Sequence, residues 1–302
     1  MPKFSSNVAL SVRDELLEPL VRSRNTFGEV LFVTSSAANL AYLTKTYKNV
    51  YTTITTAIAS SVTSRGDIIY VDSSYTETVT AVITVDKIGV SIIGLGSGNL
   101  RPTITGNGTI DAMSLTAASV TVENIRFAGP LTTAQTADIN VAGAGCTIRN
   151  TYHIGSVGSE YKVDMITVAS GANDLLVEGV RAYNTAVITN TSWLSLEAAV
   201  ARFECRDCFV AGEFATAVLM DEATATLAYI HHNIFKNVTA AVSCVTFTTG
   251  NSTGVFGYNF VSGRHTTIAT NLVEGTGMDF VNNYVVEEPV KSGLLEPAVD
   301  AD

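Results

Sequence analysis

A short pattern returns along this 302-residue chain at a nearly constant spacing, and it constrains the fold more than any other feature. Each copy places apolar or aromatic residues on both sides of a small polar residue, as in 122–127, 148–152 and 256–260. These small polar residues, the repeat markers, are Asn124, Asn150, Gly179, Asp207, Asn233, Asn259 and Asn283. Their spacing of about 26 residues is too short for a β-propeller blade and too poor in helix for ankyrin or tetratricopeptide units.

A repeat made of short strands and polar bends predicts a solenoid, in which side chains one period apart lie above one another. Adjacent coils would be about 4.8 Å apart, with Val, Ile, Leu and Phe stacked inward. Asn, Asp and Gly tolerate left-handed backbone angles, so the markers are expected at bends, where stacked Asn side chains can hydrogen-bond along a column. We therefore predict an all-β fold, a right-handed parallel β-helix of about nine coils.

One helix is expected before the coils begin. Within 51–64, Ile54, Ile58 and Val62 recur at helical spacing, and Gly66 suits a left-handed C-terminal cap. A short amphipathic helix at this point would close the open end of the solenoid. The chain is thus divided into an N-terminal arm with a first strand at 29–33, the parallel β-helix with its cap helix, and a C-terminal tail. The predicted ranges of these three parts are 1–48, 49–287 and 288–302.

The composition indicates a protein with a large association surface. Charged residues make up only 15% of the chain and hydrophobic residues 46%, whereas an ordinary soluble domain has roughly 25% charged residues. Exposed apolar area on that scale usually marks a binding surface. The net charge of −10 argues against a nucleic-acid partner. No apolar run is long enough for a membrane span, and no signal peptide is visible, so we expect synthesis in a cytoplasm and no membrane partner.

The residues before the first markers predict a column of alternating charge. Glu123, Arg149 and Glu178 precede three consecutive markers, so in a solenoid they would lie above one another on the outer surface. Arg206 would continue the column in the next coil. Each such pair on neighbouring strands contributes only a few tenths to about 1 kcal/mol.

Cysteine and histidine positions give no clear metal or redox site. One Cys-x-x-Cys pair, Cys205 and Cys208, supplies two ligands where a structural zinc site needs four, so we interpret all four cysteines as small buried residues. His231 and His232 are adjacent in an extended segment, and their side chains are expected to point to opposite faces. His153 and His265 are isolated in the sequence. We predict no metal and no cofactor.

Aromatic residues also fall near the repeat markers. Their regular placement predicts a buried aromatic stack rather than an exposed platform for sugars. The residues in question are Phe127, Tyr152, Phe209, Phe235, Phe260 and Tyr284.

Segments 54–58 and 66–71, and then 90–98 followed by 101–104, resemble the opening of the pectin-lyase-like β-helix superfamily. In that superfamily a cap helix precedes a Gly-Asp-hydrophobic strand, and an Ile-Gly turn starts the next coil. The resemblance covers roughly 50–287 and implies a fold rather than an activity. The entry segment 24–30 and the Ser- and Thr-rich coils resemble β-helical structural proteins of tailed bacteriophages. Those include head decoration (cement) proteins and tail fibres or spikes, many of which are trimers.

The enzymes of this fold that cleave polysaccharides place two or three carboxylates on one outer face. Two groups of carboxylates could form such a set, but only residues about one period apart share a column. Glu178 and Asp207 differ by 29 and could be roughly stacked, yet Asp207 is better used as a bend residue. We interpret them as solvated or turn residues and predict no catalytic residue. The two groups are Asp164, Asp174 and Glu178, and, one coil later, Asp207, Asp221 and Glu222.

The expected function is that of a virion structural protein, a capsid decoration protein that stabilises the head shell as a homotrimer. Its partner would be the major capsid protein or another virion protein. The alternative is a tailspike or tail fibre that binds or cleaves host surface polysaccharide, as a glycoside hydrolase or polysaccharide lyase would. A secreted lyase is a third, weaker option because no export signal is visible. The partner-binding residues predicted in the arm and the tail are Leu16, Leu17, Leu20, Phe27, Leu294 and Leu295.

Overall fold

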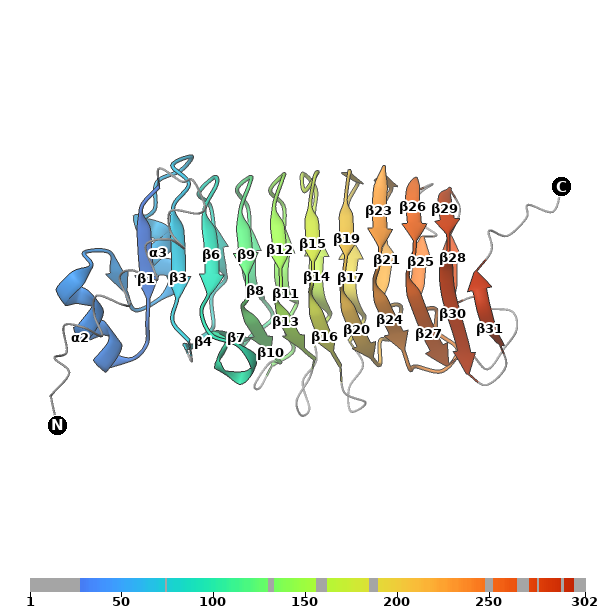
Figure 1. The fold of residues 1–302 in the computed structure, drawn as a ribbon, viewed down its shortest axis with the longest axis horizontal. Helices are drawn as coiled ribbons and strands as arrows, with labels where there is room; N and C mark the ends of the chain where they lie inside the picture. Colours follow the sequence, from blue (N-terminus) through green and yellow to red (C-terminus); the bar gives the residue numbers. More distant parts are fainter. Residues whose placement is uncertain are drawn as a thin grey trace, which may run out of the picture.

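The computed structural model describes residues 28–73, 75–129, 133–155, 162–184, 190–247, 252–264, 272–275, 277–288 and 291–295. These residues form a right-handed parallel β-solenoid of about seven turns, which Figure 1 shows as a rod. The predicted fold class is confirmed. The number of turns is lower than the nine predicted, because the strands at both ends of the rod belong to one or two sheets rather than to complete three-sided coils.

Three sheets run along the rod, with parallel pairing between successive coils. Sheet A contains, in spatial order, β2 (Val50–Tyr51), β1 (Val30–Val33), β3 (Ile68–Val71), β6 (Ser91–Gly94), β9 (Thr121–Glu123), β12 (Thr147–Arg149), β15 (Leu176–Glu178), β19 (Glu204–Arg206), β23 (Ala228–His231), β26 (Gly254–Gly257) and β29 (Met278–Val281). Sheet B contains β4 (Thr76–Val79), β7 (Thr103–Gly106), β10 (Arg126–Ala128), β13 (Tyr152–Ile154), β16 (Arg181–Tyr183), β20 (Phe209–Gly212), β24 (Ile234–Asn237), β27 (Phe260–Arg264), β30 (Asn283–Glu288) and β31 (Lys291–Leu295).

Sheet C is the shortest of the three sheets. It contains β5 (Ile83–Val85), β8 (Asp111–Leu115), β11 (Ala137–Val141), β14 (Asp164–Val168), β17 (Ser192–Leu196), β21 (Leu219–Asp221), β25 (Val245–Phe247) and β28 (Val273–Gly275). Two short elements lie outside the three sheets: the pair β18 (Val200–Ala201) with β22 (Ala225–Thr226), and the 3-10 helix η1 (Gly98–Leu100).

The predicted cap helix is present as α3 (Ile54–Ser60), which is shorter than the expected 51–64. The Thr53 side chain caps its N-terminus, and Ile58 is among the buried residues that close the core. Val62 was expected on the buried stripe but lies beyond the helix and is 47% exposed. The reason is local, because the Val62 N–H donates to the buried Asp67 carboxylate instead of continuing the helix.

The range predicted as arm and first strand contains both a confirmed and an unpredicted element. The first strand is confirmed as β1, which joins sheet A between β2 and β3. Helix α2 (Ala37–Thr46) was not predicted. None of its residues is buried, so it lacks the apolar stripe by which a helix is recognised in a sequence. Ser36 caps it by accepting the N–H of Asn39.

At the other end, the range predicted as a tail contains a strand. β31 pairs antiparallel with β30, with Leu294 opposite Tyr284 and Leu295 opposite Asn283. This pairing covers the last edge of sheet B, where an open strand would otherwise present unpaired backbone groups.

The inward side chains confirm the vertical stacking that the repeat predicted. In sheet A the pairings put one residue from each of seven coils in register, and all seven are apolar or cysteine. This column is Val122, Ile148, Val177, Cys205, Ile230, Phe256 and Phe280.

The predicted charged column is also formed. Arg149 Nε lies 2.7 Å from Glu178 Oε2, and Arg206 Nη2 lies 3.1 Å from Glu178 Oε1. Glu123 stands opposite Arg149 in the register of sheet A. These groups are partly exposed, so the column orders the outer surface more than it stabilises the fold.

The repeat markers occupy two different positions. The first four lie at the bend between sheets A and B with φ between 52° and 63°. In the last three coils the residue with positive φ is one place earlier, because Arg206 pairs with His231 rather than with His232. The predicted alignment was therefore wrong by one residue at Asn233, Asn259 and Asn283.

The last three markers therefore follow the bend residue, and their side chains are buried and form a ladder inside the rod. Asn259 Oδ1 accepts from the backbone N–H and the side-chain amide of Asn233, and Asn283 Oδ1 does the same for Asn259. Asn233 Oδ1 accepts the N–H of Cys208. Each Nδ2 also donates to a carbonyl of the preceding coil. Stacked Asn side chains thus hydrogen-bond along a column as expected, but inside the rod.

We expect Asn259→Ala to lower the free energy of unfolding by about 2–4 kcal/mol, because it leaves the Asn233 N–H and the Ile230 carbonyl without these buried partners. Asn282→Gly is the matched control. Asn282 is exposed with a φ of 50°, which glycine adopts without strain, so its stability should stay within about 0.5 kcal/mol of wild type. Denaturant unfolding measures both variants. Equal midpoints would contradict a structural role for the ladder.

Candidate partner-binding surface

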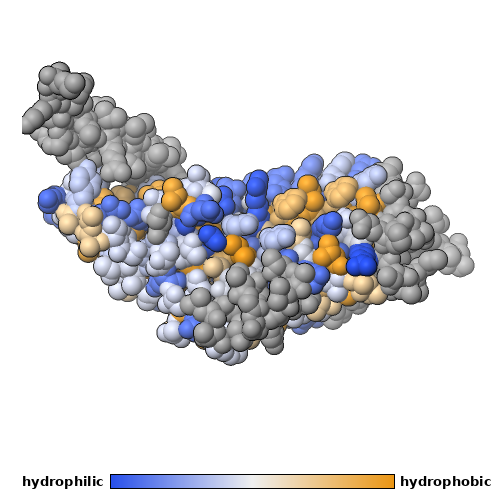
Figure 2. All heavy atoms as spheres, turned by 90° about the horizontal axis from the view of Figure 1, so that it is seen from below, coloured by the Kyte–Doolittle hydropathy of each residue, from blue (hydrophilic) through white to orange (hydrophobic). Residues whose placement is uncertain are grey.

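An apolar column runs along the outer face of sheet B. Phe209, Ile234, Phe260 and Tyr284 are in register on four consecutive strands, from β20 to β30. Their exposed fractions are 46%, 43%, 38% and 43%. We refer to these four residues as the apolar column. Figure 2 shows the rod from below the view of Figure 1, with apolar side chains gathered on the half nearer the C-terminus.

The exposure of this column corrects the prediction of a buried aromatic stack. Phe127 and Phe235 are fully buried, whereas Phe209, Phe260 and Tyr284 are exposed. Phe127 and Phe235 lie one position later in the register of sheet B than the exposed set. Because side chains alternate between the faces of a strand, one position decides between core and surface. The remaining aromatic of that set, Tyr152, is half-buried and in register with Arg126 and Arg181.

Two rings of the column stack on each other. Phe260 and Tyr284 have centroids 5.5 Å apart and planes at 19°. Parallel stacking along the rod uses the ring faces for contacts between coils, so the ring edges remain for an outside partner.

A second row of rings borders the column at the bend between sheets A and B. Tyr229 stacks on His231 with centroids 4.0 Å apart, and His232 stacks on Tyr258 at 5.4 Å. The two histidines join these pairs, with their Nδ1 atoms 2.7 Å apart. They were expected on opposite faces, but the positive φ of His232 breaks the alternation and brings both rings to one side.

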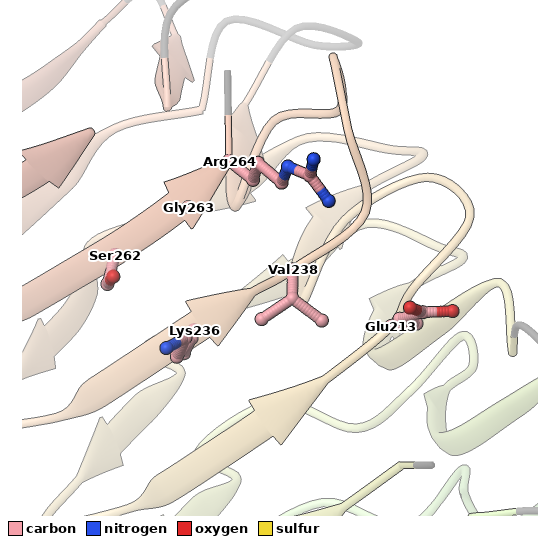
Figure 3. Close-up of a pocket in the computed structure, with 6 residues that line it drawn as sticks. All are labelled: Glu213, Lys236, Val238, Ser262, Gly263 and Arg264. Atoms are coloured by element: carbon pink, nitrogen blue, oxygen red, sulfur yellow. The ribbon is translucent and has the colours of Figure 1, made fainter. Parts of the chain in front are cut away.

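At the far ends of the same strands lies a hollow of about 370 Å³. It is lined by Glu213, Lys236, Val238, Ser262, Gly263 and Arg264. Figure 3 shows Val238 between Glu213 and Lys236, with the Arg264 guanidinium on the rim. Because Lys236 and Ser262 lie two residues after Ile234 and Phe260 on their strands, the hollow and the apolar column share one face. Apolar rings beside a few charged groups are typical of a protein interface with its rim.

None of the predicted partner-binding residues belongs to the apolar column. Leu16, Leu17, Leu20 and Phe27 are outside the described residues. Leu294 and Leu295 belong to β31, two strands beyond the Phe260 strand in sheet B. Sequence reasoning missed Ile234 and the ring row altogether. The signal available was the period itself, since Phe209, Ile234, Phe260 and Tyr284 are 24 to 26 residues apart.

The two predicted groups of carboxylates are spread over different surfaces. Asp174 pairs with Arg202, Glu178 with Arg149 and Arg206, and Asp207 lies at a bend. Asp221 is buried at the end of β21 in sheet C, and its carboxylate accepts a hydrogen bond from the Ser252 hydroxyl. Glu222 follows directly after this strand.

Asp164 differs from the other carboxylates of these groups because its pKa is raised. It is buried and accepts from the Ser192 hydroxyl at 2.6 Å. Burial raises the pKa of Asp164 to about 6, and repulsion from Glu197 and Glu222 acts in the same direction.

The described residues contain no candidate metal site and no disulfide. No group of three or more His, Cys, Asp or Glu there could hold a metal ion. The four cysteines are free and buried, as predicted. Neither described helix has the length and apolar character needed to cross a membrane.

Comparisons with known proteins add no functional assignment. No family model, curated protein sequence or solved structure matches the chain. Its function has to be inferred from the chemistry of its own surface.

Asp164 allows a test by titration. Its folded pKa of about 6 lies above the unfolded value of 3.8, so the folded state binds the proton more tightly. The contribution of Asp164 to the free energy of unfolding should therefore be fully present below 3.8 and be lost as the pH rises through about 6. Asp164→Asn keeps an acceptor for Ser192 and removes the charge. We expect it to be more stable than wild type by roughly 1–3 kcal/mol at pH 7.5, with the difference vanishing near pH 4.

The control for this titration is Asp174→Asn. Arg202 holds the pKa of Asp174 below its usual value through an exposed ion pair, so this substitution should not stabilise the protein at any pH. Thermal unfolding across a pH series measures both variants. A stability difference for Asp164→Asn that does not change with pH would contradict the raised pKa.

Proposed function

We propose that this chain is a structural protein of a virus particle, a capsid decoration protein that acts as a homotrimer of rods on the head shell. The observation that supports this is the apolar column, which leaves four large side chains between 38% and 46% exposed in one line. A contiguous exposed apolar surface usually marks an association site. Its alignment with the rod axis suits the side-by-side packing of two or more copies.

The orientation of the rings favours a protein partner over a sugar. A sugar ring stacks on the face of an aromatic residue, but the faces of Phe260 and Tyr284 are turned toward each other. Ring edges and aliphatic tips such as Ile234 interdigitate with side chains of another protein surface.

The ends of the rod favour lateral association as well. Helix α3 closes the core at one end, and the antiparallel β31 covers the edge of sheet B at the other. The covered edge of sheet B opposes end-to-end growth by strands added to that sheet, which favours contacts along the sides. Identical subunits that associate through such contacts close into a ring, and a trimer is the smallest cyclic form beyond a dimer. In this proposal the arm at 1–27 binds the shell through Leu16, Leu17, Leu20 and Phe27.

The oligomeric state tests this proposal. We expect the wild-type chain to sediment as a trimer and the double variant Phe260→Ser, Tyr284→Ser to sediment as a monomer with an unchanged circular dichroism spectrum. Each aromatic residue removed from an interface costs about 2 kcal/mol per contact. Ile88→Ser is the control, because Ile88 is 43% exposed, like Tyr284, but lies in the turn between β5 and β6. A monomeric wild type would refute the assembly.

The position on the particle is tested separately. Cryo-electron microscopy of particles from the phage that carries the gene should show rods of this length on the capsid surface. Rods on the tail, or none on the particle, would refute the decoration role even if the chain is trimeric.

One observation supports a tailspike that cleaves polysaccharide as a second candidate. Asp164 is a protonated acid at mildly acidic pH with Glu197 and Glu222 close enough to raise its pKa, and a glycosidase uses such a pair of carboxyls as acid and base. Release of reducing ends from host surface polysaccharide, lost in Asp164→Asn, would favour this candidate. The absence of release by the wild type would leave the structural role.

A further inference from the structure

The interior of the rod holds a charged cluster that the proposed surface does not use. Lys162, His153 and Asp138 are 0%, 0% and 1% exposed. Lys162 Nζ lies 2.6 Å from Asp138 Oδ1 and 2.7 Å from Oδ2, and His153 Nδ1 lies 2.9 Å from Oδ2. The three residues come from two neighbouring coils, with Asp138 in β11, His153 in β13 and Lys162 just before β14. No pattern in the sequence indicated the cluster, and His153 is isolated from the other histidines along the chain.

The cluster is held in place from every side. The Lys162 backbone forms a parallel bridge with Gln135, and its N–H donates to Asn190 Oδ1. The Phe127 ring stacks on His153 with centroids 5.1 Å apart and planes at 12°. Gln135 Nε2 donates to Asp138 Oδ1 at 3.2 Å. Each Asp138 oxygen thus has one neutral donor in addition to the lysine.

An active site for an outside substrate does not fit this geometry. Thr151 Oγ1, His153 and Asp138 form a hydrogen-bonded chain like that of a serine hydrolase. Thr151 is also fully buried, so a substrate could not reach its hydroxyl in the folded rod. The groups can react only with one another.

We propose that Lys162 and Asp138 condense into an amide cross-link between two neighbouring coils, with His153 moving a proton. The cross-link is a feature of the rod itself and does not depend on the proposed function.

The condensation needs no other reagent. Lys162 Nζ first passes a proton to the Asp138 carboxylate, which gives an amine and a carboxylic acid. Burial lowers the pKa of Lys162, which favours this transfer. The Nζ lone pair then forms a bond to Cγ, and the bond from Cγ to Oδ2 breaks. Oδ2 leaves as water with two protons from Nζ, so an ammonium and a carboxylate become an amide and water.

Gln135 and His153 act on different oxygens of the Asp138 carboxylate. Oδ1 carries the negative charge in the tetrahedral intermediate, and the Gln135 amide already donates to it. Oδ2 is the leaving atom, and it contacts His153 Nδ1. Burial lowers the pKa of His153, so the ring is neutral, with Nδ1 as donor to the carboxylate and Nε2 as acceptor for the Thr151 hydroxyl. His153 can therefore give its Nδ1 proton to Oδ2 as the bond from Cγ to Oδ2 breaks and take one from Nζ in the same step, so that the ring stays neutral.

Mass spectrometry detects the expected product. The denatured full-length chain, after allowance for loss of Met1, should be lighter than its sequence mass by one water, about 18 Da. Lys162→Arg, which keeps the charge but cannot form this amide, should match its own sequence mass. A wild-type mass equal to the sequence mass would overturn the proposal.

Peptide mapping places the missing water. Trypsin cuts after Arg126, Arg149 and Arg181 but not after an acylated Lys162, so the product should be 127–149 joined to 150–181. A free 150–162 peptide as the main species would overturn the proposal. So would a linear 127–149 peptide lacking water, which indicates a cyclic imide at Asp138.

Two further variants test the chemistry. Asp138→Asn should form the same product by loss of ammonia instead of water, so its cross-linked peptide should have the wild-type mass. His153→Gln should leave a large uncross-linked fraction in freshly folded protein that decreases over time. Complete cross-linking of His153→Gln from the outset would remove His153 from the mechanism, and absence of a cross-link in all forms would overturn the proposal itself.

Discussion

The structure depends on the vertical register between coils. Strands of successive coils pair in parallel at about 4.8 Å, and each inward side chain rests on its counterpart one coil away. In sheet A this places Ile148 between Val122 and Val177. Once that register is set, the outer side chains are also aligned in columns, so the charged column, the apolar column and the ring row all follow from the core. The packing of the inner side chains thus determines how the outer side chains are aligned.

The bends stay in register along the rod, while the side chain that follows each bend changes in character. Between the coils of Asp207 and His232, the residue after the bend changes from Cys208 to Asn233, although the strands on both sides stay aligned. The inward position at the bend, which holds Ile125, Thr151, Val180 and Cys208 in the earlier coils, holds the asparagine ladder in the last three. An amide can satisfy the backbone of the next coil, which Val180 at the same position cannot, and that change occurs in the half of the rod that bears the apolar column.

The described interior is not uniformly apolar, and two of its polar features differ in physical character. The asparagine ladder is neutral and repeats from coil to coil, so each amide is both donor and acceptor. The Asp138, His153 and Lys162 cluster occurs at one level and buries charge, which is stable only because every charged atom has a partner at hydrogen-bond distance. Charge that is sealed from water and held within 3 Å of its partner is also placed to react with it, whereas the exposed pair of Arg202 and Asp174 remains solvated.

The sequence by itself determined the solenoid, its cap helix and the Arg149–Glu178 pairing, because a period of about 26 residues is written directly in residue types. It could not decide which aromatic residues are inside, since Phe235 and Ile234 differ by one position and strands alternate their faces at every residue. It also could not show that Lys162 meets Asp138, which lies 24 residues earlier, since loop lengths between sheets set that contact. Those decisions belong to the tertiary structure, because only the packed coil fixes where each bend ends and the next strand begins.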